Sequence, residues 1–188
     1  MKNLVTLLVL VFVSFCLLAQ KPCLPEGDAT KEKKKEFNRQ KNRPVDVKPN
    51  PKSVSIDSIL KKGNDISRFN TTDYVVVEGF VVELKPGGPE SCNCGSEEAK
   101  DHDIHIYMCR KMGAEKKDCF IVEITPLFRA IHIFDYDTLV GKKVKMTGYM
   151  FFDSEHKGNA VNTCKKCSNN WRKTSWEIHP VVKLEVVN

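Results

Sequence analysis

The segment Tyr74-Val-Val-Val-Glu-Gly-Phe-Val-Val-Glu-Leu84 carries the pattern that decides the fold. β-Branched and aromatic residues dominate it and polar residues are interleaved, which is typical of a β-strand. Working outward from it, we find four more segments of the same kind. They are residues 103–108, 119–124, 143–152 and 176–187. The sequence therefore predicts five strands.

One further element lies between the third and fourth predicted strands. Residues 126–134 read PLFRAIHIF, which is too short and too apolar for a loop and indicates one helix. The resulting order is three strands, a helix and two strands. That order is typical of the OB-fold, a Greek-key barrel that binds ligands through one face and its loops. We therefore expect an all-β fold with one short helix, forming a five-stranded OB-fold barrel over residues 53–188.

The first residues have a different character. A short basic start precedes an apolar run from Leu4 to Leu18, and a small residue, Ala19, follows in a suitable cleavage context. This pattern predicts a signal peptide over residues 1–19, and hence a secreted or periplasmic protein. A lipoprotein is the less favoured alternative, because Phe15 and Pro22 stand where a small residue should precede an acylated cysteine. No later apolar run is long enough to span a membrane.

Residues 20–52 are rich in Lys, Glu, Asn and Pro and poor in large apolar side chains. Such a composition predicts a disordered tether. Residues 31–48 hold eight basic and three acidic side chains, whereas residues 49–188 hold 20 basic and 19 acidic ones. The net charge of +6 is therefore carried mainly by the tether. A near-neutral barrel gives only weak support for nucleic acid as a partner, because single-strand binders need a positive groove.

Seven cysteines follow the predicted signal peptide. Cys109 and Cys119 should lie on neighbouring strands, where a cross-strand disulfide fits. The other two pairs, Cys92 with Cys94 and Cys164 with Cys167, lie in loops at one end of an OB barrel. They could form one or two disulfides or a four-sulfur zinc site, and the exported context favours disulfides. Cys23 is then left odd, free or linked to a partner.

Histidines and carboxylates form a second group of candidate site residues. Asp103 and His105 are two residues apart on one strand and share a face, as do Glu177 and His179 on another. If these faces coincide with the loop after the fourth strand, His105, His156 and His179 with one carboxylate could hold a divalent metal such as zinc. The alternative is that these residues are buried or at the rim, paired with backbone and neighbouring polar side chains. No other cofactor is expected.

The loops at residues 85–102 and 153–175 are the expected ligand-binding loops. Trp171 and Tyr107 offer aromatic surfaces for a ligand, and polar side chains around them offer hydrogen bonds. The expected ligand-binding residues are Asp103, His105, Tyr107, Glu155, His156, Trp171, Arg172, Glu177 and His179. We expect a binding module rather than an enzyme, for an oligonucleotide, a glycan or a protein segment. The alternatives are a metal-dependent hydrolase or nuclease that uses the histidines, and a structural envelope protein.

Several short motifs resemble those of a group of uncharacterised exported bacterial OB-fold proteins. The resemblance extends over about residues 65–187. It rests on the motifs ESCNC at 90–94, DIHI at 103–106, FDSEH at 152–156 and WEIHP at 176–180. It implies the OB-fold and an export context, and it carries no activity. The chain also resembles staphylococcal-type nucleases, in barrel topology only.

Overall fold

The computed structural model describes residues 23–187, so the predicted signal peptide at residues 1–19 lies outside the described residues. All five predicted strands are present in it. Their bounds are β2 Tyr74–Pro86, β3 Ile104–Cys109, β4 Phe120–Ile124, β5 Lys143–Phe152 and β6 Trp176–Val187. The last two have the predicted bounds. Local strand pattern therefore decided the secondary structure of the barrel.

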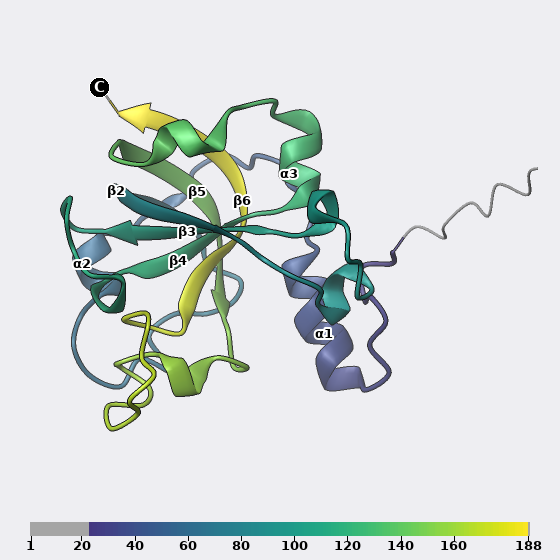
Figure 1. The fold of residues 1–188 in the computed structure, drawn as a ribbon, viewed down its shortest axis with the longest axis horizontal. Coiled ribbons are helices and arrows are strands. Elements are labelled where there is room, and N and C mark those ends of the chain that lie inside the picture. The colour runs from purple at the N-terminus through teal and green to yellow at the C-terminus, as the bar shows by residue number, and fades with distance from the viewer. Residues whose placement is uncertain (1–22, 188) are drawn as a thin grey trace, which may run out of the picture.

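These strands close into a barrel of OB-fold topology (Figure 1). β2 pairs antiparallel with both β3 and β5, β3 with β4, and β5 with β6. The barrel closes where β4 and β6 pair in parallel. A short strand, β1 Lys52–Ser53, adds to the edge of β2. The fold is thus the predicted five-stranded OB-fold barrel.

Helices are few and short. α3 Pro126–Ile131 lies between β4 and β5, as predicted, and Thr125 caps its N-terminus by accepting a hydrogen bond from the Phe128 amide. α2 Ile56–Ile59 precedes the barrel. Short 3-10 helices span Ser91–Asn93, Ala99–Asp101, Lys116–Asp118, Tyr136–Leu139 and Lys157–Asn159. Among the described residues, no helix has the length and apolar character needed to cross a membrane.

The barrel interior holds the apolar core. Alternate residues of β2, such as Val75 and Val77, point inward and are fully or almost fully buried. The segment around α2 adds the buried side chains of Ile59 and Leu60 to the same core. Burial of each such side chain stabilises the fold by about 1.5–3 kcal/mol relative to exposure. The core therefore holds the strands on which the polar site is built.

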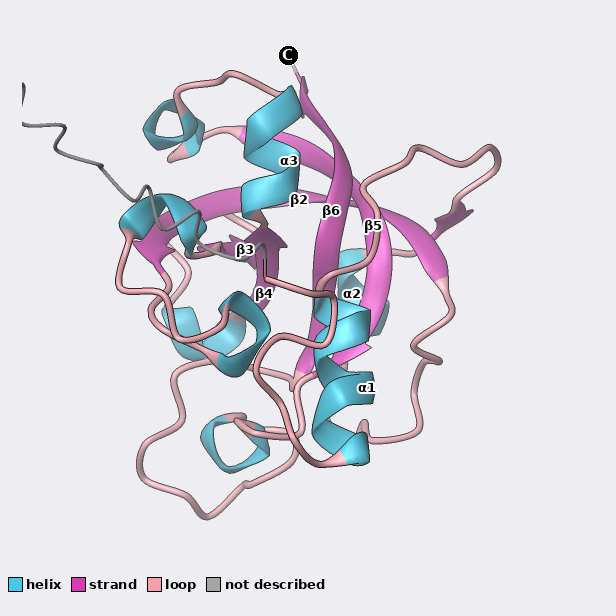
Figure 2. Ribbon diagram, turned by 90° about the vertical axis from the view of Figure 1, so that its right-hand side faces the viewer, coloured by secondary structure: helices cyan, strands magenta, loops and turns pink. Residues whose placement is uncertain are grey.

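The prediction that residues 20–52 form a disordered tether is wrong for the part that the structure describes. The N-terminal arm, residues 23–52, contains helix α1 Glu32–Lys41, which lies against β6 and the Ser91–Asn93 segment (Figure 2). Phe37 packs on Phe151, with 4.8 Å between ring centroids. Asn38 is fully buried, and its side chain bonds to the Glu26 carbonyl and to Ser91. Polar contacts and one aromatic pair replace the large apolar surface that the arm lacks.

Three disulfides are present in residues 23–187: Cys23–Cys94, Cys109–Cys119 and Cys164–Cys167. The cross-strand bridge between β3 and β4 is as predicted. The expectation for Cys23 and Cys92 is wrong, because Cys23 is bonded while Cys92 is a free, buried thiol. Docking of the arm brings Cys23 to Cys94, and the Cys92 thiol faces the Glu90 carboxylate instead. Cys94 and the Cys164–Cys167 pair are thus consumed separately, which removes the four-sulfur zinc site.

Candidate functional site

A pocket of about 580 Å³ lies on the barrel face made by β3, β4 and the two long loops. We call it the acidic pocket. Its carboxylates are Glu83, Glu90, Glu123, Asp153, Glu155 and Glu177. Its other lining residues are Lys41, Lys85, Lys116, His105, His156, Tyr107 and Trp171. The second and third strands and these loops are where OB-folds bind ligands.

Arg172 organises one side of this pocket from beneath. Its guanidinium is fully buried, donates to Asp153 Oδ2 at 2.7 Å, and also donates to Glu177 Oε1. Burial would raise the pKa of Asp153, but a hydrogen bond from His156 and the Arg172 charge hold that pKa well below its usual range. Burial, reinforced by the charges of Glu123 and Asp153, raises the pKa of Glu177 well above its usual range. The two carboxyls that share this guanidinium therefore have pKa values shifted in opposite directions.

His179 lies at the floor, between two carboxylates. Its Nδ1 is 2.8 Å from Glu123 Oε2, and its Nε2 is 3.5 Å from Asp103 Oδ2. Burial raises the pKa of Asp103 to about 7, with Glu123 adding to the effect. Burial opposes ionisation of Glu123 too, but His105, His179 and Lys41 together bring its pKa well below the usual range. The pKa values of two neighbouring carboxyls are thus shifted in opposite directions, and strongly shifted pKa values are common at functional sites.

Lys41, the last residue of α1, supplies a buried positive charge to the same pocket. Its side chain is 7% exposed and forms an ion pair with Glu90 Oε2. Burial would lower the pKa of Lys41, but the charges of Glu123, Cys92 and Glu90 raise it well above its usual range. Lys41 remains charged and partly offsets the carboxylates. The N-terminal arm is therefore part of the site.

The pocket rim is more exposed. His156 Nδ1 is 2.6 Å from Asp153 Oδ2, and this hydrogen bond raises the pKa of His156. Its ring lies 5.8 Å from that of Trp171, which is half-buried and stacks over Arg172 at 4.8 Å. Tyr107 meets Trp171 edge to face at 6.1 Å but is itself 5% exposed. Trp171 and His156 therefore form the accessible ring surfaces.

The structure brings the predicted ligand residues to one region but at two depths. Those lining the acidic pocket are His105, Tyr107, Glu155, His156, Trp171 and Glu177. Asp103, Arg172 and His179 lie beneath or beside it. The predicted metal set of three histidines is not assembled, because His156 pairs with Asp153 at the rim. Within residues 23–187, the group with metal-ligand proximity is Asp103, Glu123 and His179.

Several residues that line the pocket are not among the predicted ligand-binding residues, and three of them are Glu123, Glu90 and Lys41. Glu123 is a carboxylate in the middle of the apolar run Phe120–Ile124, and a charge at such a position was a usable signal. Glu90 was noticed only as part of a motif. Lys41 gave no signal, because its segment has the composition of a disordered chain.

Comparisons with known proteins give little beyond this geometry. No family model and no curated protein matches the sequence. One similar solved structure is the crystal structure of yeast Stn1 and Ten1, at 14% identity and a TM-score of 0.43. The match covers 74% of this chain and 64% of that one, so this chain spans less than two thirds of its length. The OB-fold assignment therefore rests on the strand order and pairing of the protein itself.

Proposed function

We propose that this protein is a binding module whose ligand enters the acidic pocket. The observation that carries the proposal is the position of this pocket. It lies over β3 and β4, between the two loops that follow β2 and β5, where the OB-fold places its ligands. A concave site with a few convergent polar groups is the usual form of a ligand pocket.

The charges of the pocket favour a glycan over a nucleic acid. Six carboxylates line it against three lysines. Lys116 is paired with Glu83 at 3.0 Å and Lys41 with Glu90, so neither is free for a phosphate. A phosphodiester would meet the ionised Glu123 and Asp153 at the floor. Sugar hydroxyl or amino groups, by contrast, can donate hydrogen bonds to these carboxylates while a ring face covers Trp171.

The proposal is tested by titrating the protein with a glucosamine oligosaccharide, its N-acetylated form, single-stranded oligothymidine and a basic peptide. We expect calorimetry to detect binding of a glycan and to detect no binding of oligothymidine. Trp171→Ala should abolish the signal, whereas Phe134→Ala, which removes an exposed aromatic ring outside the pocket, should leave it unchanged. Tighter binding of oligothymidine or of the peptide than of both glycans would overturn the glycan assignment.

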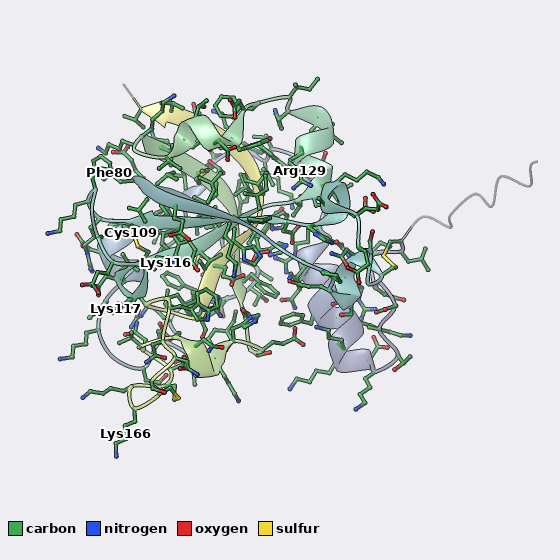
Figure 3. All side chains as sticks on the ribbon, viewed as in Figure 1. Phe80, Cys109, Lys116, Lys117, Arg129 and Lys166 are labelled. Carbon is green, nitrogen blue, oxygen red and sulfur yellow. A yellow bond between two sulfur atoms is a disulfide. The ribbon has the colours of Figure 1, made fainter. Side chains whose placement is uncertain are left out.

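Two adjacent lysines give a matched test of charge. Lys116 and Lys117 come from the same 3-10 helix (Figure 3), but only Lys116 lines the acidic pocket. Both variants, Lys116→Glu and Lys117→Glu, change the net charge equally. An amino glycan should bind Lys116→Glu more tightly than Lys117→Glu, and an anionic ligand should show the opposite order.

We also propose that the protein is secreted or periplasmic. Three disulfides support this location, because such bonds persist mainly in oxidising compartments. N-terminal sequencing of the exported protein would test it, with cleavage after Ala19 as the expected result. Retention of the uncleaved chain in the cytoplasm would contradict it.

A metal-dependent hydrolase is the second candidate function. The observation that favours it is the proximity of Asp103, Glu123 and His179 at the floor of the same region. Release of reducing ends from the bound glycan, abolished by a chelator, would support it. If the glycan is unchanged after prolonged incubation with added Zn²⁺, the hydrolase candidate is rejected and the binding function remains.

A further inference from the structure

Three strands place three potential metal ligands together beneath the acidic pocket. Asp103 directly precedes β3, Glu123 lies on β4 and His179 lies on β6. Glu123 is opposite His105 in the β3–β4 ladder, and the parallel pairing of Ile121 with Glu177 brings β6 alongside. One donor atom from each of Asp103, Glu123 and His179 lies within 4.8 Å of the others.

Donor atoms of His179 and Glu123 lack hydrogen-bond partners. Both ring nitrogens of His179 and Oε2 of Glu123 are buried, and none makes a hydrogen bond of acceptable geometry. Nδ1 and Oε2 are only 2.8 Å apart, so two polar atoms converge without a bond between them. Burying unpaired polar groups is costly. A cation between them would satisfy the lone pairs of both side chains.

The surrounding charges point to a cation as well. Four carboxyl groups, those of Asp103, Glu123, Glu177 and Asp153, lie within 4.0 Å of His179 or Arg172, and a fifth, Glu90, pairs with Lys41. The buried cations among them are Lys41 and Arg172. Arg172 is held by Asp153 and Glu177, and Lys41 by Glu90. The charge of Lys41 also acts on Asp103 and Glu123, but Lys41 pairs with Glu90, and within residues 23–187 no lysine or arginine forms an ion pair with Asp103 or Glu123.

We propose that Asp103, Glu123 and His179 bind one divalent transition-metal ion. Two carboxylates and one imidazole nitrogen are suited to Zn²⁺ and similar ions, whereas Mg²⁺ and Ca²⁺ prefer oxygen ligands alone. Three protein ligands also leave a position open for water or for a ligand group. The site differs from the predicted set of three histidines in using Glu123 and Asp103 in place of His105 and His156.

His105 acts as a positioning residue for this site. Its Nε2 is 3.3 Å from Glu123 Oε1, whereas the other oxygen of that carboxylate, Oε2, is the one near His179. Groups that hold a metal ligand in orientation typically change metal affinity by about 10- to 100-fold when removed. Entry is open on two sides, because Glu123 lines the acidic pocket and Asp103 lines a neighbouring pocket of about 500 Å³ beside the Cys23–Cys94 bond.

The experiment is a titration of the purified, metal-free protein with Zn²⁺ by calorimetry and with Co²⁺ by visible absorption, without any glycan. We expect one ion per chain. The visible Co²⁺ band should be more intense than that of octahedral water complexes and less intense than that of four-sulfur sites. Asp103→Asn and Glu123→Gln should each abolish binding. His105→Gln should weaken it roughly 10- to 100-fold.

His156→Gln is the matched control, because its imidazole contacts a carboxylate at the same pocket but lies outside the proposed ligand set. It should bind Zn²⁺ like the unmodified protein. Circular dichroism of each variant identifies any that fail to fold, and Asp103, whose side chain is 12% exposed, is the ligand whose replacement disturbs packing least. Absence of stoichiometric binding, or binding that survives Asp103→Asn but not His156→Gln, would overturn the proposal. Neither result depends on the glycan, so the two proposals fail separately.

Discussion

Replacing Arg172 with methionine should destabilise the protein strongly at neutral pH. The guanidinium is fully buried and is the shared partner of Asp153 and Glu177, whose side chains are 8% and 3% exposed. Methionine keeps much of the volume but leaves two buried carboxyl groups without their cation. Breaking a buried ion pair by removing one partner costs about 3–5 kcal/mol. We expect a loss of this size in the free energy of unfolding at pH 7.

The pH dependence of that loss separates charge from packing. The pKa of Asp153 is depressed in the folded protein, so its contribution to stability is present above the unfolded pKa of about 3.9 and is lost as pH falls through the folded value. Without Arg172, only the hydrogen bond and charge of His156 oppose the effect of burial, so we expect the folded pKa of Asp153 to rise above its unfolded value and the carboxyl to take up a proton in mild acid. Glu177, whose pKa is already raised by burial, should also take up its proton more readily without Arg172, which again reduces the cost of the substitution as pH falls. The deficit of the variant should therefore shrink between pH 7 and pH 4.

Urea denaturation of the unmodified protein and of Arg172→Met at pH 4, 5, 6 and 7 measures the difference in their free energies of unfolding. The matched control is Arg39→Met on α1, because Arg39 also contacts three carboxylates, Glu26, Glu32 and Glu36, but at the exposed surface. Exposed ion pairs contribute little, so this variant should differ only slightly from the unmodified protein. A loss for Arg172→Met below about 1 kcal/mol, or a deficit that stays constant from pH 4 to 7, would refute the reasoning.

The remaining predictions concern the free thiol, the arm and the pocket rim. Iodoacetamide should label Cys92 only after denaturation, because burial raises the pKa of its thiol to about 12; a labelled Cys92 peptide from the native protein would contradict this. Replacing Cys23 and Cys94 together with serine should lower the free energy of unfolding by about 4 kcal/mol, the chain-entropy value for a 71-residue separation, and a loss under about 1 kcal/mol in urea denaturation would contradict that model. His156→Gln should lower the melting temperature more at pH 5 than at pH 9, since the raised pKa of His156 gives stability that is present below about 6.5 and lost as pH rises through the folded value. An equal shift at both pH values would show that the charge interaction with Asp153 contributes nothing.

The sequence predicted the barrel well because the barrel is built from local pattern. Each strand has its own run of β-branched and aromatic residues, and α3 has a capping threonine and a proline at its start. It predicted poorly what depends on long-range contacts. Helix α1 has a single large apolar residue, Phe37, and it is held in place by the Cys23–Cys94 bond and by buried Asn38. Neither contact has a signature within residues 31–48.

Prediction of the site succeeded and failed for the same reason. The alternation of a strand put Glu177 and His179 on one face, and their side chains come within 4.0 Å of each other. Asp103 precedes β3 and lines a different pocket from His105. Alternation gave no account of depth, so exposed His156 and buried His179 were treated as equivalent. It also overlooked Glu123, which lies between β3 and β6 and connects their histidines.

The arm gives the chemistry of the pocket a dependence on oxidation. The Cys23–Cys94 bond ties the arm to the loop after β2, and Lys41 of the arm pairs with Glu90 of that same loop. This loop ends at Asp103, where β3 begins. Lys41 is therefore held at the acidic pocket by the disulfide, by its ion pair with Glu90, and by hydrogen bonds from Asn38 to Ser91 and from Asn42 to the Cys92 carbonyl. A reduced chain keeps the ion pair and the hydrogen bonds but loses the covalent link, so we expect reduction to loosen the arm and with it the position of Lys41.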